Sequence, residues 1–253
     1  MSQLLLGKAA IVTGGSRGLG AEIAVQLAKH GANVLISYNK AQEEAEKVAQ
    51  TIRQLGQQAV IVQGGSMDRE TPTRIVQTAV ENYGKIDIII NNAGVGDDCL
   101  LKDISHDFWD LVYDTNVRMP AFLLKAALPF LGLAPRIVNI SSIAARAAYE
   151  ATSVYSSSKA ALEGLTRSWA IELGHKYNAT INCVNPGPIA TDMMAEAHPN
   201  AMDFWNAKVK ETPASPRMGT VDDVTQIVIF LCEDRSRWCT GSVINANGGL
   251  VPV

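Results

Sequence analysis

Apolar and polar positions follow two alternating periods along this chain. Compact apolar runs such as 87–91 are each followed by a longer segment in which apolar residues recur at helical spacing, as Leu19, Ile23 and Leu27 do. Short runs bounded by turn residues are typical of buried strands, and helical spacing is typical of helices that bury one face. The pattern predicts strands at 9–13, 33–38, 59–63, 87–91, 136–141, 180–184 and 242–246. It predicts helices at 18–30, 42–55, 69–83, 108–131, 154–177 and 221–233, with Pro120 and Pro129 interrupting or bending the fourth.

The regular alternation of strands and helices predicts the fold class. Strands that are separated by helical segments pair in parallel through right-handed crossovers, which place helices on both faces of one sheet. We therefore expect an α/β fold with a Rossmann-type doubly wound parallel sheet of about seven strands. The 253 residues show no linker or repeat, so 1–253 is expected to form a single domain.

Residues 188–219 depart from this alternation because they carry little periodicity. A long irregular connection inside a compact domain is uncommon and often functional. We interpret the segment as a lid over a substrate pocket. The alternative is a small helix docked on the surface or in a contact between subunits. The apolar residues that this polar segment carries are Met193, Met194, Met202, Phe204 and Trp205.

The composition narrows the classes of function. Hydrophobic residues make up 47% of the chain and charged residues 19%, and the formal net charge is -3, so the clustered positive charge that nucleic-acid binding needs is not expected. The four cysteines and four histidines show no spacing typical of disulfide frameworks or catalytic metal sites, which predicts free thiols and no metal. We find no signal peptide and no apolar run long enough to span a membrane, so a cytoplasmic protein without a membrane partner is expected.

The first candidate site is the glycine-rich turn 13–20 between the first predicted strand and helix. In a doubly wound sheet this turn meets the pyrophosphate of a dinucleotide. Its glycines let the backbone approach phosphate oxygens, and the amide groups and dipole of the following helix favour negative charge. We therefore predict a dinucleotide-binding turn, formed by Gly14, Ser16, Arg17, Gly18, Leu19 and Gly20.

The end of the second predicted strand indicates which nicotinamide dinucleotide is bound. A carboxylate there would accept the ribose hydroxyls of NAD and repel the 2'-phosphate of NADP. Residues 37–40 read Ser-Tyr-Asn-Lys, and no carboxylate appears before Glu43. Arg17 and Lys40 can instead present positive charge to a phosphate, so we predict NADP(H) as the cofactor. The alternative is that both are ordinary solvated surface charges.

Tyr155 and Lys159 form the core of the predicted chemical site. Four positions apart in a helical segment, their side chains project from one face. A phenol has an ordinary pKa of about 10, and a nearby ammonium favours the phenolate, so Lys159 is expected to lower the pKa of Tyr155. Ser142, at the end of the preceding strand, can donate a hydrogen bond to a substrate carbonyl. Alone, the pair would be an exposed helix pair; with Ser142 and the glycine turn, it favours hydride transfer to a carbonyl.

In these motifs the chain resembles a classical short-chain dehydrogenase/reductase over essentially its whole length. The family's T-G-x-x-x-G-x-G turn matches 13–20, its N-N-A-G stretch matches 91–94 and its Y-x-x-x-K signature matches 155–159. Its serine stands 13 positions before the tyrosine, at Ser142, and its additional asparagine falls on Asn116. The resemblance implies that Tyr155 is the acid/base, that Ser142 orients the carbonyl and that Lys159 binds the nicotinamide ribose. It implies that Asn116 supports a water-linked proton path with Lys159.

The resemblance also implies the remaining cofactor contacts. Many members place an Asp-Val pair after the third strand to contact adenine, where this chain has Gly65 and Ser66, so adenine recognition is expected to be looser or to use Ser66. The turn after the sixth predicted strand would contact the nicotinamide amide. Beyond the glycine turn, the implied cofactor-binding residues are Tyr38, Asn39, Lys40, Ser66, Asn92, Ala93, Gly94, Tyr155, Lys159, Pro186, Gly187, Ile189 and Thr191.

Among the subgroups, the glycine turn and the end of the second strand resemble NADPH-dependent ketoreductases, including 3-oxoacyl-carrier-protein reductases and fungal polyketide or hydroxynaphthalene reductases. The resulting hypothesis is NADPH-dependent reduction of a small-molecule ketone to a secondary alcohol. The alternatives are NAD-linked alcohol oxidation, an epimerisation or cyclisation, and a non-catalytic binding role. The resemblance further implies a homo-oligomer, a tetramer or dimer, built with the helices around 108–131 and 153–177 and the C-terminal segment.

Overall fold

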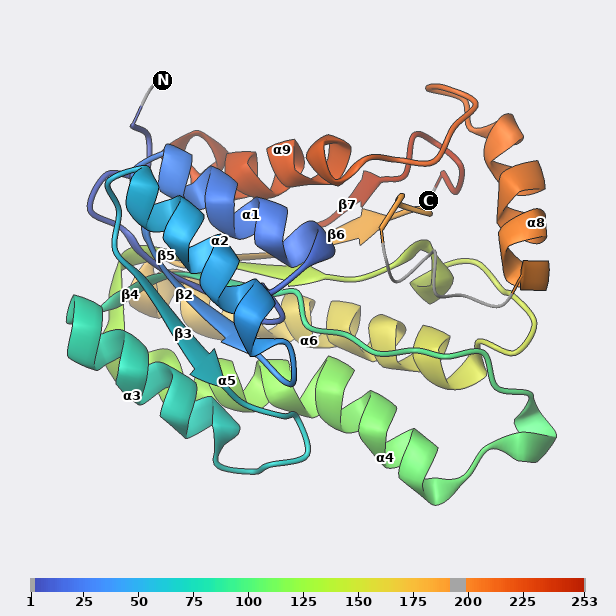
Figure 1. Cartoon of the computed structure of the whole chain (residues 1–253), viewed down its shortest axis with the longest axis horizontal. Helices are drawn as coiled ribbons and strands as arrows, with labels where there is room; N and C mark the ends of the chain where they lie inside the picture. Colours follow the sequence, from blue (N-terminus) through green and yellow to red (C-terminus); the bar gives the residue numbers. More distant parts are fainter. Residues whose placement is uncertain (1–2, 192–198, 253) are drawn as a thin grey trace.

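The computed structural model describes residues 3–191 and 199–252, and one parallel sheet runs through them (Figure 1). Its strands lie in the order β3-β2-β1-β4-β5-β6-β7, so the order reverses at β1, whose neighbours are β2 and β4. A doubly wound sheet binds ligands outside the carboxyl ends of its strands at such a reversal. The predicted fold class is confirmed. The strands are β1 (Ala9–Val12), β2 (Asn33–Tyr38), β3 (Ala59–Gln63), β4 (Ile86–Asn91), β5 (Leu131–Ile140), β6 (Thr180–Pro186) and β7 (Val243–Ala246).

Helices cover both faces of the sheet (Figure 1). One face carries α1 (Gly18–Lys29), α2 (Gln42–Gln54) and α9 (Val221–Cys232). The other face carries α3 (Thr71–Tyr83), α4 (His106–Tyr113), α5 (Met119–Ala127) and α6 (Ser153–Tyr177). A further helix, α8 (Pro199–Lys208), lies outside these two layers.

Two apolar layers, one on each face of the sheet, hold these elements together. In β1, Ala10 and Val12 pack into the layer under α1, α2 and α9, and Ile11 packs into the layer under α3, α5 and α6. All six residues of β4 are buried. Strands buried on both faces are nearly continuously apolar, and this is why the run 87–91 could be recognised from the sequence.

The helical stretch predicted at 108–131 is divided near both Pro120 and Pro129, as the two prolines indicated. The chain forms α4 and α5, joined by the π-helical turn Asp114–Arg118, and then a 3-10 turn at Leu128–Phe130. The Met119 amide donates to the Asp114 carbonyl, an i to i+5 bond that widens the helix immediately before Pro120. Pro120 therefore lies in the first turn of α5, where its missing N–H costs little.

Two further boundaries differ from the prediction. The fifth strand starts at Leu131 and not at 136, because Leu131 pairs with Ile86 before a register shift in β4. Within this strand Ala134, which precedes a proline, has a φ of 54°. In 188–219, which was expected to be irregular, the described part contains α8 and a bridge between Ile189 and Gly219.

Candidate active site

The glycine-rich turn joins β1 to α1 at the carboxyl edge of the sheet. Gly14 and Gly18 adopt φ angles of 63° and 57°, which residues with a Cβ rarely adopt. A Cβ at Gly20 would lie 2.5 Å from the Gly14 carbonyl oxygen, so the turn closes only without a side chain there. The N-cap residue Arg17 makes no capping bond to the first turn of α1 with its side chain, which suits an anion at that turn. The other predicted residues of the turn are Ser16, Arg17 and Leu19, of which Arg17 is exposed.

Asn92 and Ala93, directly after β4, hold this turn from the neighbouring strand. Their backbone amides each donate to the Thr13 hydroxyl at 3.1 Å. Asn92 Nδ2 donates to the carbonyls of Thr13 at 2.9 Å and Gly14 at 3.1 Å. The Asn92 side chain also occupies the space that a Cβ at Gly20 would need. Asn92 therefore shapes the backbone that the sequence predicts to bind phosphate.

The end of β2 lies against the same turn. The Ser37 hydroxyl accepts from the Gly14 amide at 3.4 Å, and the Ser37 carbonyl accepts from the next amide at 3.1 Å. Tyr38 is 6% exposed and belongs to the apolar layer under α1 and α2. Asn39 and Lys40, which follow it, are exposed. The structure therefore separates Tyr38, whose ring lies in the core, from the two polar residues beside the turn.

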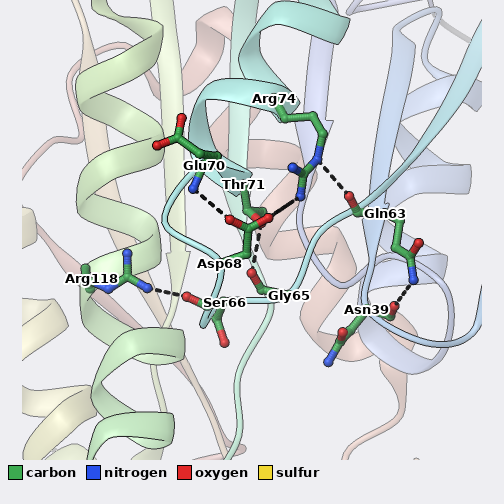
Figure 2. A network of polar contacts seen from close by, with 9 residues as sticks. All are labelled: Asn39, Gln63, Gly65, Ser66, Asp68, Glu70, Thr71, Arg74 and Arg118. Carbon is green, nitrogen blue, oxygen red and sulfur yellow. Dashed lines mark hydrogen bonds and ion pairs between the residues drawn. The ribbon is translucent and has the colours of Figure 1, made fainter.

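Ser66, predicted to contact adenine, lies in the loop after β3. Its hydroxyl oxygen lies 2.5 Å from Oγ1 of Thr115, and its carbonyl accepts a hydrogen bond from Arg118 (Figure 2). Thr115 and Arg118 belong to the π-helical turn between α4 and α5. Ser66 is thus bonded to the turn that carries Asn116.

Tyr155 and Lys159 lie one turn apart on α6, at the carboxyl end of β5. Lys159 Nζ lies 5.7 Å from the centroid of the Tyr155 ring and donates to the Ile140 carbonyl at 2.8 Å. Lys159 is 3% exposed. Ser142 follows the end of β5, and its side chain hydrogen-bonds the Tyr155 phenol. The structure brings these three predicted residues together.

Burial sets the proton affinities of the pair. Burial raises the pKa of the Tyr155 phenol above its ordinary 10.0, and the hydrogen bond with Ser142 opposes this only in part. Burial lowers the pKa of Lys159 from 10.5 to about 8. The expectation that Lys159 lowers the pKa of Tyr155 is therefore wrong in direction, because desolvation favours the neutral form of both groups. A neutral phenol is the form that donates a proton.

Asn116, in the π-helical turn, faces the same group of residues and is 1% exposed. Its Oδ1 accepts from the Val95 amide at 3.0 Å, and its Nδ2 donates to the Val95 carbonyl at 2.8 Å and the Ser158 hydroxyl at 3.0 Å. A Cβ at Gly94 would lie 3.4 Å from Asn116 Oδ1 and 3.2 Å from Lys159 Nζ. A side chain at position 94 would therefore crowd both groups, which lie close to the Gly94 backbone.

Sequence reasoning missed Gly96, which packs directly on the Tyr155 ring. A Cβ at this position would lie 2.7 Å from Cγ and 2.8 Å from Cε2 of Tyr155. No side chain larger than hydrogen fits unless the ring moves. The only sign of this role in the sequence was a second glycine two positions after Gly94, just outside the N-N-A-G motif at 91–94.

Sequence reasoning also missed an ion pair, between Arg146 and a buried glutamate, that involves the segment after Ser142. Glu163 on α6 is 2% exposed, and its Oε2 lies 2.5 Å from Nε of Arg146. Its Oε1 accepts from the Ser141 hydroxyl at 3.0 Å and from Asn185 Nδ2 at 3.5 Å. These bonds tie the segment after Ser142 to the helix that carries the tyrosine. A glutamate in a helical pattern is normally solvated, so this pair could not be recognised from the order of residues.

The segment after β6 meets the glycine-rich turn at Thr191. Pro186 ends β6 and Gly187 follows it. Ile189 forms a parallel bridge to the segment before α9. The Thr191 methyl lies 3.8 Å from where a Cβ of Gly18 would be. Of the predicted nicotinamide contacts, Thr191 therefore lies next to the predicted phosphate turn.

Three aromatic rings join the segment after Ser142 to α8. Tyr149 and Trp205 meet edge to face at 5.1 Å between centroids, and Phe204 meets Trp205 at 5.0 Å in the same manner. Such contacts fix ring orientations beyond simple burial. Met193 and Met194, which the sequence also placed in the lid, lie outside the described residues.

Two wider searches of residues 3–191 and 199–252 bear on other kinds of site. No helix in these ranges is long and apolar enough to cross a membrane. No group of three or more His, Cys, Asp or Glu in them is placed to hold a metal ion. The four cysteines are free thiols, of which Cys183 and Cys232 are buried.

Comparison with known proteins defines the class to which this fold and site belong. A family model described as enoyl-(acyl carrier protein) reductase matches residues 14–251. The chain belongs to the short-chain dehydrogenase/reductase family of oxidoreductases.

Individual relatives are similar over nearly the whole chain. The short-chain dehydrogenase/reductase FrzI of a Cladobotryum species is 66% identical over 252 residues, which are 98% of this chain and 98% of the relative. Versicolorin reductase stcU of Emericella nidulans is 38% identical over 252 residues, 96% of this chain and 95% of the relative. The crystal structure of a short chain dehydrogenase from Burkholderia cenocepacia in complex with NADP has a TM-score of 0.91 and 37% identity, and covers 98% of this chain and 100% of that one.

Proposed function

We propose that this protein is an NADP(H)-dependent ketoreductase that reduces a ketone to a secondary alcohol, on a polyketide-like or oxoacyl substrate. The observation that carries the proposal is the gathering of Ser142, Tyr155, Lys159 and Asn116 beside the glycine turn at one edge of the sheet. The NADP complex of the Burkholderia relative and the reductase names of the versicolorin relatives support it.

The residues of the site have complementary tasks in this reaction. The raised pKa of Tyr155 keeps the phenol neutral, so that it donates its proton to the carbonyl oxygen of the substrate. The Ser142 hydroxyl donates a hydrogen bond to the same oxygen and stabilises the charge that develops there. When bound, the reduced nicotinamide supplies the hydride that the carbonyl carbon accepts.

Lys159 and Asn116 restore the proton of Tyr155. Lys159 is held by the Ile140 carbonyl within 5.7 Å of the phenol ring, and its pKa of about 8 lets it exchange protons near neutrality. Asn116 Oδ1 and the ammonium both lie close to Gly94. In this proposal a water between them passes the proton onward.

The residues around the glycine turn fit the pyrophosphate and 2'-phosphate of NADP(H). Asn92 and the Gly14 carbonyl pack closely on Gly20 and fix the shape of the turn, and the side chain of the N-cap residue Arg17 makes no capping bond to the N-terminus of α1. Arg17 and Lys40 are both exposed beside it. In the proposal, these two cations bind the 2'-phosphate.

Replacing Lys40 with serine is expected to raise the Kd for NADPH about tenfold and to leave that for NADH within about twofold, because one charge-assisted bond to a phosphate is worth roughly 1.5–3 kcal/mol. Quenching of intrinsic fluorescence by each cofactor measures both constants. Lys47→Ser, on the exposed side of α2, is the matched control. Equal weakening of both cofactors would show that Lys40 does not read the phosphate.

We further propose that residues 188–219 act as a lid over the substrate pocket. The contacts of Tyr149 with Phe204 and Trp205 support this, since they place α8 against the segment that follows Ser142. A pocket closed by these rings favours a substrate with an apolar or aromatic surface.

A substrate screen tests the proposed function. The parent protein is mixed with NADPH and a panel of ketones that includes oxoacyl thioesters and polyhydroxylated aromatic ketones, and NADPH absorbance is followed. Enoyl thioesters are included as a comparison. Oxidation of NADPH with a ketone but not with an enoyl thioester supports the proposal. Faster reaction with an enoyl thioester, or binding of NADPH without turnover of any ketone, would contradict it.

The protein is also proposed to form a homo-oligomer, a tetramer or dimer, in the cytoplasm. Exposed apolar side chains on the helices expected to meet support the first part, among them Trp109 on α4, Phe122 on α5 and Ile171 on α6. The free thiols fit a reducing compartment. Light scattering coupled to gel filtration is expected to give two or four times the mass of the chain, and a monomer would contradict the proposal.

A further inference from the structure

The π-helical turn between α4 and α5 contacts two separate parts of the molecule. Asn116 reaches toward the active site, where it is bonded to Val95 and Ser158. Its neighbours Thr115 and Arg118 instead contact Ser66 in the loop after β3. One turn therefore carries both the proposed proton-path residue and the anchors of a loop that is proposed to lie at the adenine end of the cofactor.

Arg118 is the centre of this anchor. Its Nη2 donates to the Ser66 carbonyl, and its Nε lies 2.5 Å from Oδ1 of Asp114 (Figure 2 shows the first bond). The side chains of Arg118 and Asp114 are only 13% and 15% exposed. Thr115, 5% exposed, adds the 2.5 Å contact with the Ser66 hydroxyl. Because these groups are largely removed from water, their bonds are strong and leaving a partner unpaired is costly.

The same loop is fixed on its other side to α3 and lies against the segment after β2. Figure 2 shows the Thr71 hydroxyl donating to the Gly65 carbonyl, at 2.9 Å, and Arg74 paired with Asp68, at 2.8 Å. A Cβ at Gly65 would lie 3.2 Å from Oδ1 of Asn39, a proposed cofactor residue. Asn39, Gly65, Asp68 and Arg74 line a cleft of about 600 Å³. The loop is thus a braced connection between the cofactor side and the π-helical turn.

We propose that Arg118 is a positioning residue that couples the loop at the adenine end of the cofactor to the alignment of Asn116. The inference rests on the proposed function, since it needs a dinucleotide at this loop and a proton path through Asn116. In its π-helical conformation the turn makes the contacts of Asn116 in the active site and those of Arg118 with the loop at the same time. The bond from the Met119 amide to the Asp114 carbonyl maintains this conformation. Regular α geometry would rotate Asn116 relative to Val95, and a misplacement of about 1 Å costs roughly a hundredfold in rate.

A double-mutant cycle on kcat and on the Kd for NADPH tests this coupling. Arg118→Gln is expected to lower kcat about tenfold and to raise the Kd several-fold, because the loop and the turn separate. In the Asn116→Ala background, Arg118→Gln is expected to cause no further loss of kcat, since Asn116 is the residue through which Arg118 acts, while the effect on Kd persists. Arg235→Gln makes the same change after α9, at a side chain that is 68% exposed and pairs with Glu233 rather than with the loop or the π-helical turn, and is the control.

Two results would overturn the coupling. One is an equal loss of kcat from Arg118→Gln in the parent and in the Asn116→Ala background, and the other is a rise in the Kd for NADPH with no change in kcat. Arg118→Lys keeps the charge but cannot reach both acceptors as a guanidinium does, so partial recovery of kcat is expected. If Arg118→Gln does not fold, Thr115→Val, which removes only the hydroxyl contact with Ser66, replaces it in the same double-mutant cycle. Thr115→Val is expected to cause a smaller loss of kcat, and this loss should also disappear in the Asn116→Ala background.

The parent protein separates failure of this inference from failure of the proposed function. A parent that binds no NADPH and reduces no ketone overturns the proposed function and the coupling with it. A parent that binds and reduces normally, with variants whose effects are simply additive, overturns the coupling alone.

Discussion

Tyr155→Phe is expected to lower kcat for ketone reduction by about a thousandfold and to leave the Kd for NADPH within about twofold, because only the phenolic hydroxyl is removed and general acid catalysis contributes roughly 10²–10⁴. The ring keeps its contact with Gly96, so the fold of the site is preserved. Steady-state and single-turnover absorbance assays with the best ketone of the screen measure the effect.

The direction of the pKa shifts makes this prediction specific to reduction. Burial raises the pKa of Tyr155, so the proton donor remains neutral throughout the physiological range. Oxidation of an alcohol by the reverse reaction needs the phenolate, and is expected to gain rate as pH rises. A reductive rate that rose with pH in the parent would contradict the assignment of a neutral phenol as the donor.

Tyr177→Phe is the matched control for this substitution. Tyr177 lies at the far end of the same helix, α6, and packs on the apolar layer under α3 and α5. The variant is expected to keep the activity of the parent. If Tyr155→Phe and Tyr177→Phe lost activity equally, the loss at Tyr155 would reflect damage to the helix and not removal of the acid.

Much of the fold and part of the site could be predicted because they depend on local patterns. The run of three isoleucines in the fully buried β4 reflects burial on two faces, and the helical spacing of α1 reflects burial on one. Both patterns appear directly in the order of residues. Gly14 and Gly18 could be identified because positive φ angles at a strand-to-helix turn require glycine.

Other features depend on contacts between distant segments and left no local signal. The π-helical turn differs from an α-helix by one backbone bond, which hydrophobic spacing does not encode. The pairing of Glu163 with Arg146 and Ser141 joins α6 to the segment after β5. The direction of the Tyr155 pKa could not be predicted either, because a charged neighbour is visible in sequence and desolvation is not.

Lys159→Met is expected to abolish reductase activity and yet to stabilise the protein at pH 7 by about 2 kcal/mol. Burial lowers the pKa of Lys159 from 10.5 to about 8, a shift that corresponds to roughly 3 kcal/mol against the folded state when both states are protonated. The methionine removes this cost but also loses the hydrogen bond from Nζ to the Ile140 carbonyl, worth about 1 kcal/mol. Thermal unfolding at pH 7 is expected to show an increase in Tm of about 5 °C.

The pH dependence of that gain distinguishes a buried ammonium from improved packing. Between the folded pKa of about 8 and the unfolded 10.5, the unfolded parent binds a proton that the folded parent lacks, so the stability of the parent rises with pH across this window. The advantage of Lys159→Met should therefore be complete below about pH 8, shrink above it, and turn into a loss of about 1 kcal/mol near pH 10.5, where only the lost hydrogen bond remains. Better packing of methionine would give an advantage that does not change with pH, and that result would contradict the desolvated lysine. The buried ammonium that the proposed proton relay needs lowers the stability of the fold. Lys159 therefore serves the reaction and not the folding of the protein.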